Sequence, residues 1–212
     1  HLLNFDFLLD GARDIGYPGL PMDVAFAKAK IGSVSYTLFE PIAWMPQVEF
    51  KAYANAVNHL MDDSKRMDVP VRMDMPGQTK TYGGYAQATI VQGDHSIQAK
   101  LDGYATNAYA EMTMYVPNEV EMFMLTWPDV DRQDVGLFVS DQWKSTERLT
   151  ADFNVRVEQA FTQMKNEMGK GQFSVFGYDD SDFEVNHLVV NVGTAANYQW
   201  NDAFSTKISA SY

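Results

Sequence analysis

Short segments with strictly alternating hydrophobic and polar residues predict most of the β-structure of the chain. Residues 33–39 alternate and are rich in β-branched and aromatic side chains, which is typical of a strand. Residues 69–75 alternate too, but Pro70 and Pro76 lack an N–H to donate to a ladder, so this strand should be short or lie at a sheet edge. Towards the end of the chain the same criteria predict strands over residues 172–176, 183–192 and 198–211.

Two segments predict β-hairpins. Gly93-Asp94 is a glycine-led pair that suits a two-residue turn between residues 86–92 and 95–101. That loop length sets three apolar pairs on one face: Ile90 with Ile97, Ala88 with Ala99, and Ala86 with Leu101. A slip of one residue would destroy this sorting, so the register is well determined.

A second hairpin is expected where residues 109–116 and 120–126 flank the loop 117–119. The expected pairs are Val116 with Val120, Met114 with Met122, and Met112 with Met124. Large apolar side chains occur on both faces of the second arm, which predicts a strand that is either buried on both faces or in contact with a partner.

Two longer segments show apolar residues at intervals of three and four, the period of an amphipathic helix. The first covers residues 46–61 and starts at Pro46, which suits a first helical position. The second covers residues 145–168 and is followed by Gly169, a typical C-terminal cap. The expected fold class is therefore α+β, with mainly antiparallel β-sheets, sandwich or barrel-like, and two amphipathic helices packed against them.

No internal repeat and no linker is visible, which indicates a single domain over residues 1–212. Its N-terminal part, residues 1–21, has an apolar segment followed by a glycine- and proline-rich loop. We expect this part to dock on a neighbouring subunit.

Composition narrows the function classes. The chain has 16 basic and 28 acidic residues, a net charge of −12, and a pI near 4.6, which disfavours general nucleic-acid binding. The absence of cysteine excludes disulfides, zinc–thiolate sites and cysteine nucleophiles. No apolar run approaches the roughly 20 residues of a membrane helix, so no membrane span is expected.

Histidine offers a candidate site for copper. If His1 is the mature N-terminus, its amine and imidazole can bind one copper ion, and His187 or His95 would supply a second imidazole. This arrangement resembles the histidine brace of lytic polysaccharide monooxygenases and related periplasmic copper proteins. The metal residues under this alternative are His1 and His187, with copper as the only cofactor considered.

No motif supports an enzyme. The acidic group at residues 129–134 lacks the glycine and glutamate positions of a calcium loop. Both this group and the one at residues 179–184 are interpreted as solvated turns, with a cation site as the alternative. No nucleophile elbow, phosphate loop or dinucleotide fingerprint is present. We therefore name no catalytic residue, and an enzyme or ligand-binding domain without a recognisable motif stays an open alternative.

The order of elements between residues 33 and 126 resembles the tail-tube-like domain of bacteriophage distal tail and baseplate hub proteins. A strand (33–39) leads to a predicted helix (46–61), then to a short strand ending Met-Asp-Met-Pro76, a loop with Gly77, Gly83 and Gly84, and the first hairpin. The resemblance implies a non-enzymatic structural subunit of a large homo-oligomer in a virion. Its partners would be further copies and other assembly subunits. The alternative is an exported copper-binding or small-ligand-binding protein, periplasmic or secreted, that uses the N-terminal histidine.

Overall fold

The computed structural model describes all 212 residues, and they form nine long β-strands and one short helix. The elements in chain order are β1 (Leu2–Ile15), β2 (Asp23–Ile42), β3 (Met45–Asp62), β4 (Arg72–Gln92), β5 (His95–Tyr115), β6 (Met122–Lys144), β7 (Leu149–Met164), α1 (Glu167–Ser174), β8 (Glu184–Asn201) and β9 (Phe204–Ser211). No helix in the chain is long and apolar enough to cross a membrane.

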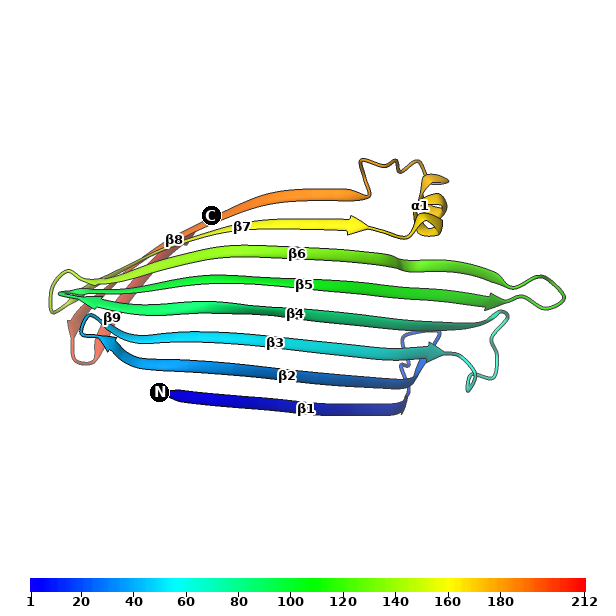
Figure 1. Cartoon of the computed structure of the whole chain (residues 1–212), viewed down its shortest axis with the longest axis horizontal. Helices are drawn as coiled ribbons and strands as arrows, with labels where there is room; N and C mark the ends of the chain where they lie inside the picture. Colours follow the sequence, from blue (N-terminus) through cyan, green and yellow to red (C-terminus); the bar gives the residue numbers. More distant parts are fainter.

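All nine strands belong to one antiparallel sheet in which each strand pairs with its neighbours in the sequence. The strand order is β1 to β9 without a crossover, so β1 and β9 are the two edges. The sheet is curved: in Figure 1, β8 and β9 swing behind the other strands. Of the 149 backbone hydrogen bonds, 132 lie within strands and the helix, so the sheet satisfies most of its own backbone groups.

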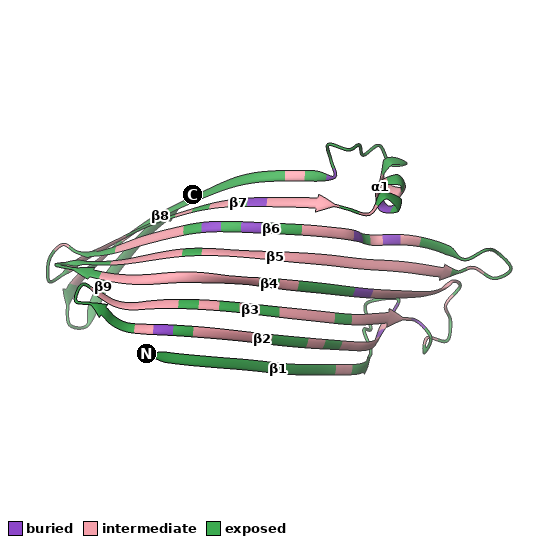
Figure 2. Cartoon of the chain, viewed as in Figure 1, coloured by how far each residue is buried: buried purple, intermediate pink, exposed green.

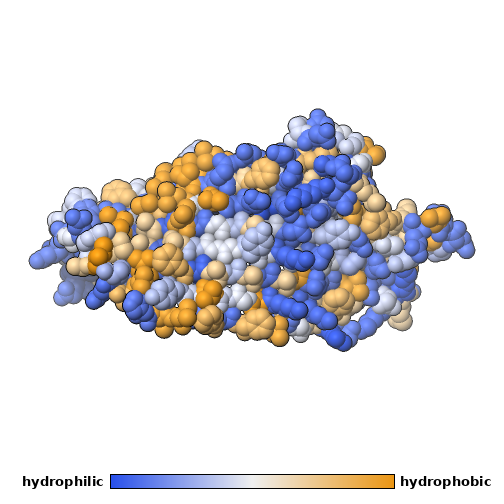
Figure 3. All heavy atoms as spheres, viewed as in Figure 1, coloured by the Kyte–Doolittle hydropathy of each residue, from blue (hydrophilic) through white to orange (hydrophobic).

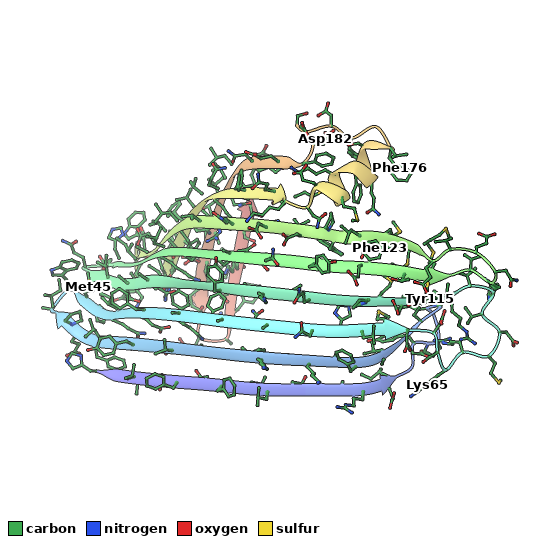
Figure 4. All side chains as sticks on the ribbon, turned by 45° about the vertical axis from the view of Figure 1, so that its right-hand side comes forward. Met45, Lys65, Tyr115, Phe123, Phe176 and Asp182 are labelled. Atoms are coloured by element: carbon green, nitrogen blue, oxygen red, sulfur yellow. The ribbon has the colours of Figure 1, made fainter.

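The connections differ between the two ends of the sheet. One end, the turn end, has the tight connections 43–44, 93–94, 145–148 and 202–203. The other end, the loop end, has the longer connections 16–22, 63–71, 116–121 and 165–183. Figure 4 shows Met45 at the turn end and Lys65 and Tyr115 at the loop end.

The sheet is a single layer without an ordinary hydrophobic core. Only 12 of 212 residues are buried, and no large side chain is fully buried. Figure 2 shows the strands almost entirely at intermediate or full exposure. A water-soluble domain of this length would bury most of its large apolar side chains between two layers, so the exposed apolar residues call for another explanation.

The helix α1 caps the loop end of β6. Asn166 accepts a hydrogen bond from the Gly169 N–H (3.1 Å), and the Gln172 side chain accepts one from the Leu125 N–H (2.9 Å). Gly169 packs directly on Pro128, where a Cβ atom would lie 2.1 Å from a proline carbon. Glycine is therefore needed at this position for close approach, and it does not serve as a helix terminator.

The predicted fold class was wrong because both predicted helices are strands. Residues 46–61 belong to β3, and residues 149–164 of the second segment form β7. The error has a simple cause. Apolar residues four apart, such as Phe153, Val157 and Phe161, lie on one side of a helix and also on one face of a strand. The only helix is α1, and it begins where the second predicted helix was expected to end.

The first predicted hairpin is confirmed, and the second is confirmed except at its turn. The β4–β5 register pairs Ile90 with Ile97, Ala88 with Ala99, and Ala86 with Leu101, as expected from the two-residue turn. In β5–β6, Met114 faces Met122 and Met112 faces Met124, whereas Val116 and Val120 lie in the connecting loop.

The other predicted strands have mixed outcomes. Residues 33–39 lie within β2 and 183–192 largely within β8. The predicted strand at residues 172–176 was wrong, because these residues form the end of α1 and the turn after it. The apolar N-terminal segment forms β1 and pairs with β2 along most of its length.

Candidate functional site

The ladder registers divide the sheet into two chemically different faces. Side chains directly opposite each other in neighbouring strands share a face, so a row can be followed across the sheet. One row on the first face is apolar on all eight strands that it crosses: Leu3, Tyr36, Phe50, Ala86, Leu101, Leu137, Val157 and Val190. The neighbouring row on the opposite face is mainly polar: Asn4, Ser35, Lys51, Tyr85, Asp102, Gly136, Glu158 and Val189.

The sheet is curved so that its apolar face is convex. We therefore call the apolar face the outer face and the opposite, mainly polar face the inner face. Figure 3 shows the apolar side chains gathered over the turn-end half of the visible, convex face. On this face, Phe5 and Phe7 are 75% and 72% exposed, and Leu101 is 55% exposed. A continuous apolar surface of this kind is unfavourable in water and indicates contact with an apolar environment.

The exposed apolar surface forms a belt with defined edges. Along β4 the outer-face positions run from Ile90 to Tyr82, which corresponds to about 27 Å of strand. The next outer-face residue towards the loop end is Lys80. Aromatic side chains occur at both edges of the belt: Trp143, Phe153, Tyr198 and Trp200 towards the turn end, and Tyr82 and Phe161 towards the loop end.

An ion-pair cluster centred on Arg156 lies on the inner face. The guanidinium donates two hydrogen bonds to Asp102, both of 2.9 Å, and two to Glu158, of 2.9 and 2.7 Å. To reach Asp102 on β5, the side chain crosses β6 above Gly136. A Cβ atom at Gly136 would lie 2.5 Å from Arg156 Nη2, so only glycine leaves room for this crossing.

A second pair lies towards the loop end of the same face. Arg132 donates through Nε and Nη2 to the two carboxylate oxygens of Asp134, both at 2.8 Å, and Asp134 is only 3% exposed. Such two-pronged arginine–carboxylate bonds hold both charges in a fixed geometry. Tyr85 donates to Glu49, and the hydroxyls of Thr81 and Thr106 are 2.8 Å apart. The inner face is thus a hydrophilic surface whose charged groups are largely paired.

At the loop end, one clamp holds two loops together. Arg66 in loop 63–71 donates to Asp23 through Nε (2.9 Å) and Nη2 (2.5 Å), and to the Tyr17 carbonyl (2.8 Å). The hydrogen bond to Asp23 raises the pKa of Arg66 above its usual value. The loop between β1 and β2 is thereby tied to the loop between β3 and β4.

The structure does not bring the two predicted copper ligands together. His1 precedes β1, and its Nδ1 lies 3.0 Å from the Tyr36 hydroxyl. His187 lies on β8 opposite Ala160, and six strands of the sheet separate β1 from β8. His95, the other ligand considered, has Nδ1 2.7 Å from Asp141 and stacks on Trp143.

No group of three or more histidine, aspartate or glutamate side chains in the chain is arranged to hold a metal ion. In the first acidic group, Asp129 and Asp131 each accept a 2.6 Å bond from Asn107, and Asp131 also pairs with Lys165. In the second group, Asp179 lies in loop 165–183 and accepts bonds from the Ser181 N–H (2.8 Å) and hydroxyl.

Sequence reasoning missed the two features that define this site. Asp102 and Arg156 are 54 positions apart and belong to no motif. A signal was nevertheless present, because polar residues occupy alternate positions through the middle of β5, β6 and β7. The apolar residues between them were interpreted as the interior of a domain rather than as an exposed surface.

Comparison with known proteins gives a likeness among solved structures. No protein-family model matches the chain, and no curated protein sequence matches it. Among solved structures, the chain is similar to the copper transporter OprC, with a TM-score of 0.72 and 17% sequence identity. The matched region covers 88% of this chain but only 30% of OprC, so the likeness concerns the fold of one part of that protein.

This likeness overturns the resemblance to phage tail-tube domains. The chain forms one antiparallel sheet of long strands that is similar in fold to part of OprC, and it lacks the helix at residues 46–61 on which the resemblance depended. The expected role as a structural ring subunit and the expected location in a virion were therefore wrong. Of the two functional alternatives, the exported protein agrees better with the fold.

Proposed function

We propose that this chain forms part of the wall of a transporter or receptor in the outer membrane of a Gram-negative bacterium. The outer face contacts lipid, and the inner face lines the interior. The observation that carries the proposal is the separation of apolar and polar side chains across the strands of one single-layered sheet, with the apolar side exposed. The likeness to OprC supports it independently.

The dimensions and edges of the belt agree with a lipid environment. A tilted transmembrane strand needs about 9–11 residues, and the outer-face positions from Ile90 to Tyr82 span this length. Transmembrane sheets carry an apolar band about 25 Å tall with aromatic residues at both boundaries, which corresponds to the belt and its aromatic edges. The strands continue beyond the belt only at the loop end, where outer-face residues become polar.

The unequal ends of the sheet give the orientation. In outer-membrane proteins the short turns face the periplasm and the long loops face outward. The turn end would therefore lie at the periplasmic boundary. The loops with the Arg66–Asp23 clamp and α1 would lie outside the cell.

The inner face supports passage or binding of a polar solute. Its carboxylates and guanidinium groups are hydrogen-bonded to one another. The inner face therefore offers polar groups to water or a solute without a strong unpaired charge. The unpaired edges of β1 and β9 cannot face lipid, since no water is available there to satisfy their N–H and C=O groups. The proposal thus requires further strands alongside both edges.

Membrane fractionation after export in a Gram-negative host tests the proposal. The protein is expected in the outer-membrane fraction, and it should remain there after washing with alkaline carbonate, which removes peripheral proteins. A protein that folds and is recovered in the soluble periplasmic fraction would contradict the proposal. A periplasmic binding protein serves as the marker for that fraction.

A further inference from the structure

A cluster of positive charges lies on the outer face immediately beyond the loop-end edge of the belt. It consists of Lys28 and Lys30 on β2, Lys80 on β4 and Arg13 on β1. We call these four residues the basic cluster. The registers place Lys30 and Lys80 in one row, with only Ala56 between them, and Lys28 in the next row towards the loops.

The four charges of the basic cluster lie together on one face and are not neutralised by carboxylates of the protein. The chain carries a net charge of −12, yet none of these four cations forms an ion pair. Other basic residues of the chain do: Lys65, Arg66, Arg72, Arg132, Arg156, Lys165 and Lys170. All four members of the basic cluster are exposed.

The spacing within the basic cluster suits phosphate groups. Lys30 and Lys80 are two strands apart, which corresponds to about 10 Å, and Lys28 and Lys30 are two residues apart, about 7 Å. A flexible lysine side chain can close these distances around one or two phosphates.

Beside Lys28 the outer face has a shallow hollow of about 410 Å³, lined also by Asn58, Gln78 and Tyr109. These side chains add neutral hydrogen-bonding groups to the positive charge. Glu111 also lines the hollow and accepts a hydrogen bond from the Tyr109 hydroxyl, so the one carboxylate there already has a partner.

We propose that the basic cluster binds the phosphate groups of anionic lipids in the outer leaflet of the membrane. This inference rests on the proposed membrane location. The position of the basic cluster favours a lipid over a soluble phosphate, because the apolar belt ends at Tyr82 and Lys80 follows on the same face of the same strand. Acyl chains on the belt would place their headgroups at this height, where lysine and arginine attract anionic lipids.

The test uses the full chain with a triple variant, Lys28→Gln, Lys30→Gln and Lys80→Gln. A matched control is Lys51→Gln, Lys144→Gln and Lys207→Gln, which removes the same charge from lysines outside the basic cluster that also lack ion pairs. Each protein is inserted into bilayers with equal amounts of phosphatidylcholine and a phosphorylated anionic lipid. It is then extracted in mild detergent, and the retained lipid is counted by native mass spectrometry.

We expect the wild type and the control to retain the anionic lipid in preference to phosphatidylcholine, and the triple variant to lose this preference by about tenfold or more. Equal retention by the triple variant and the wild type, or no preference in the wild type, would overturn the inference. Insertion into pure phosphatidylcholine is measured in parallel. If the proteins insert there, the membrane location stands whatever the outcome for anionic lipid, so the two proposals fail separately.

Discussion

Replacing Leu101 by Lys is expected to lower the free energy of unfolding of the membrane-inserted protein by about 2–4 kcal/mol, the cost of a cation near the bilayer midplane. Leu101 is on the outer face at the centre of the belt, in the row that is apolar on eight strands. A lysine there would have no partner and would have to be desolvated or to distort the bilayer. Reversible unfolding in urea, in bilayers of defined composition, measures this loss.

The matched control is Gln98→Lys. Gln98 is on the same strand but on the inner face, opposite Thr89 and Ser140. An added cation there remains in contact with water, so we expect a change below about 1 kcal/mol, as for other exposed substitutions. Similar losses for the two variants would mean that the faces do not differ in environment.

Replacing Arg156 by Met is expected to cost about 1–3 kcal/mol, because two carboxylates would lose the donor that they share. Arg156 bridges Asp102 on β5 and Glu158 on β7, so its removal leaves two like charges facing each other across Gly136. The charge of the inner face would also become more negative, which should raise the conductance for cations over anions if this face lines a channel. Urea unfolding and single-channel recording measure the two effects.

Two further variants sharpen this prediction. Arg148→Met removes an exposed arginine without an ion pair in the connection 145–148 and should leave stability nearly unchanged. Arg156→Lys keeps the charge but cannot make four directed bonds, so it should restore only part of the loss. If Arg156→Met were as stable as Arg148→Met, the bridge would have no structural role.

The hairpins could be predicted from the sequence because their turns fix the register locally. Gly93 adopts a φ of +59°, which glycine tolerates without strain, and the apolar pairs on either side allow only one alignment. Consecutive strands pair across the whole sheet, but the longer connections at the loop end do not fix a register locally, so the pairing across them could not be predicted in the same way.

The two helices were predicted wrongly because apolar residues four positions apart fit both the period of a helix and the period of a strand. Val48, Ala52 and Ala56 are four residues apart and satisfy both the helical and the strand pattern. The deciding residues lie between them: Phe50 and Ala54 are also on the outer face, which gives an apolar residue at every second position. An apolar residue at every second position over the whole segment is therefore stronger evidence for a strand than apolar residues three and four positions apart are for a helix.

The functional surface was missed because it does not depend on a motif. A strand crosses a bilayer with few residues and shows an apolar side chain only at every second position, so no long apolar run appears. Small residues on the outer face, such as Ala99 and Gly103, make the alternation of apolar and polar residues harder to recognise in the sequence. Once the registers align the strands, the same residues form a continuous belt.

A nitroxide spin-label scan along β5, residues 97–105, in lipid bilayers determines directly which face of the sheet contacts lipid. We expect collision with oxygen, which dissolves in lipid, to peak at the outer-face positions 97, 99, 101, 103 and 105. Collision with a water-soluble nickel chelate should peak at the inner-face positions between them. An absence of this alternation, or the opposite phase, would contradict the assignment of the apolar face to lipid.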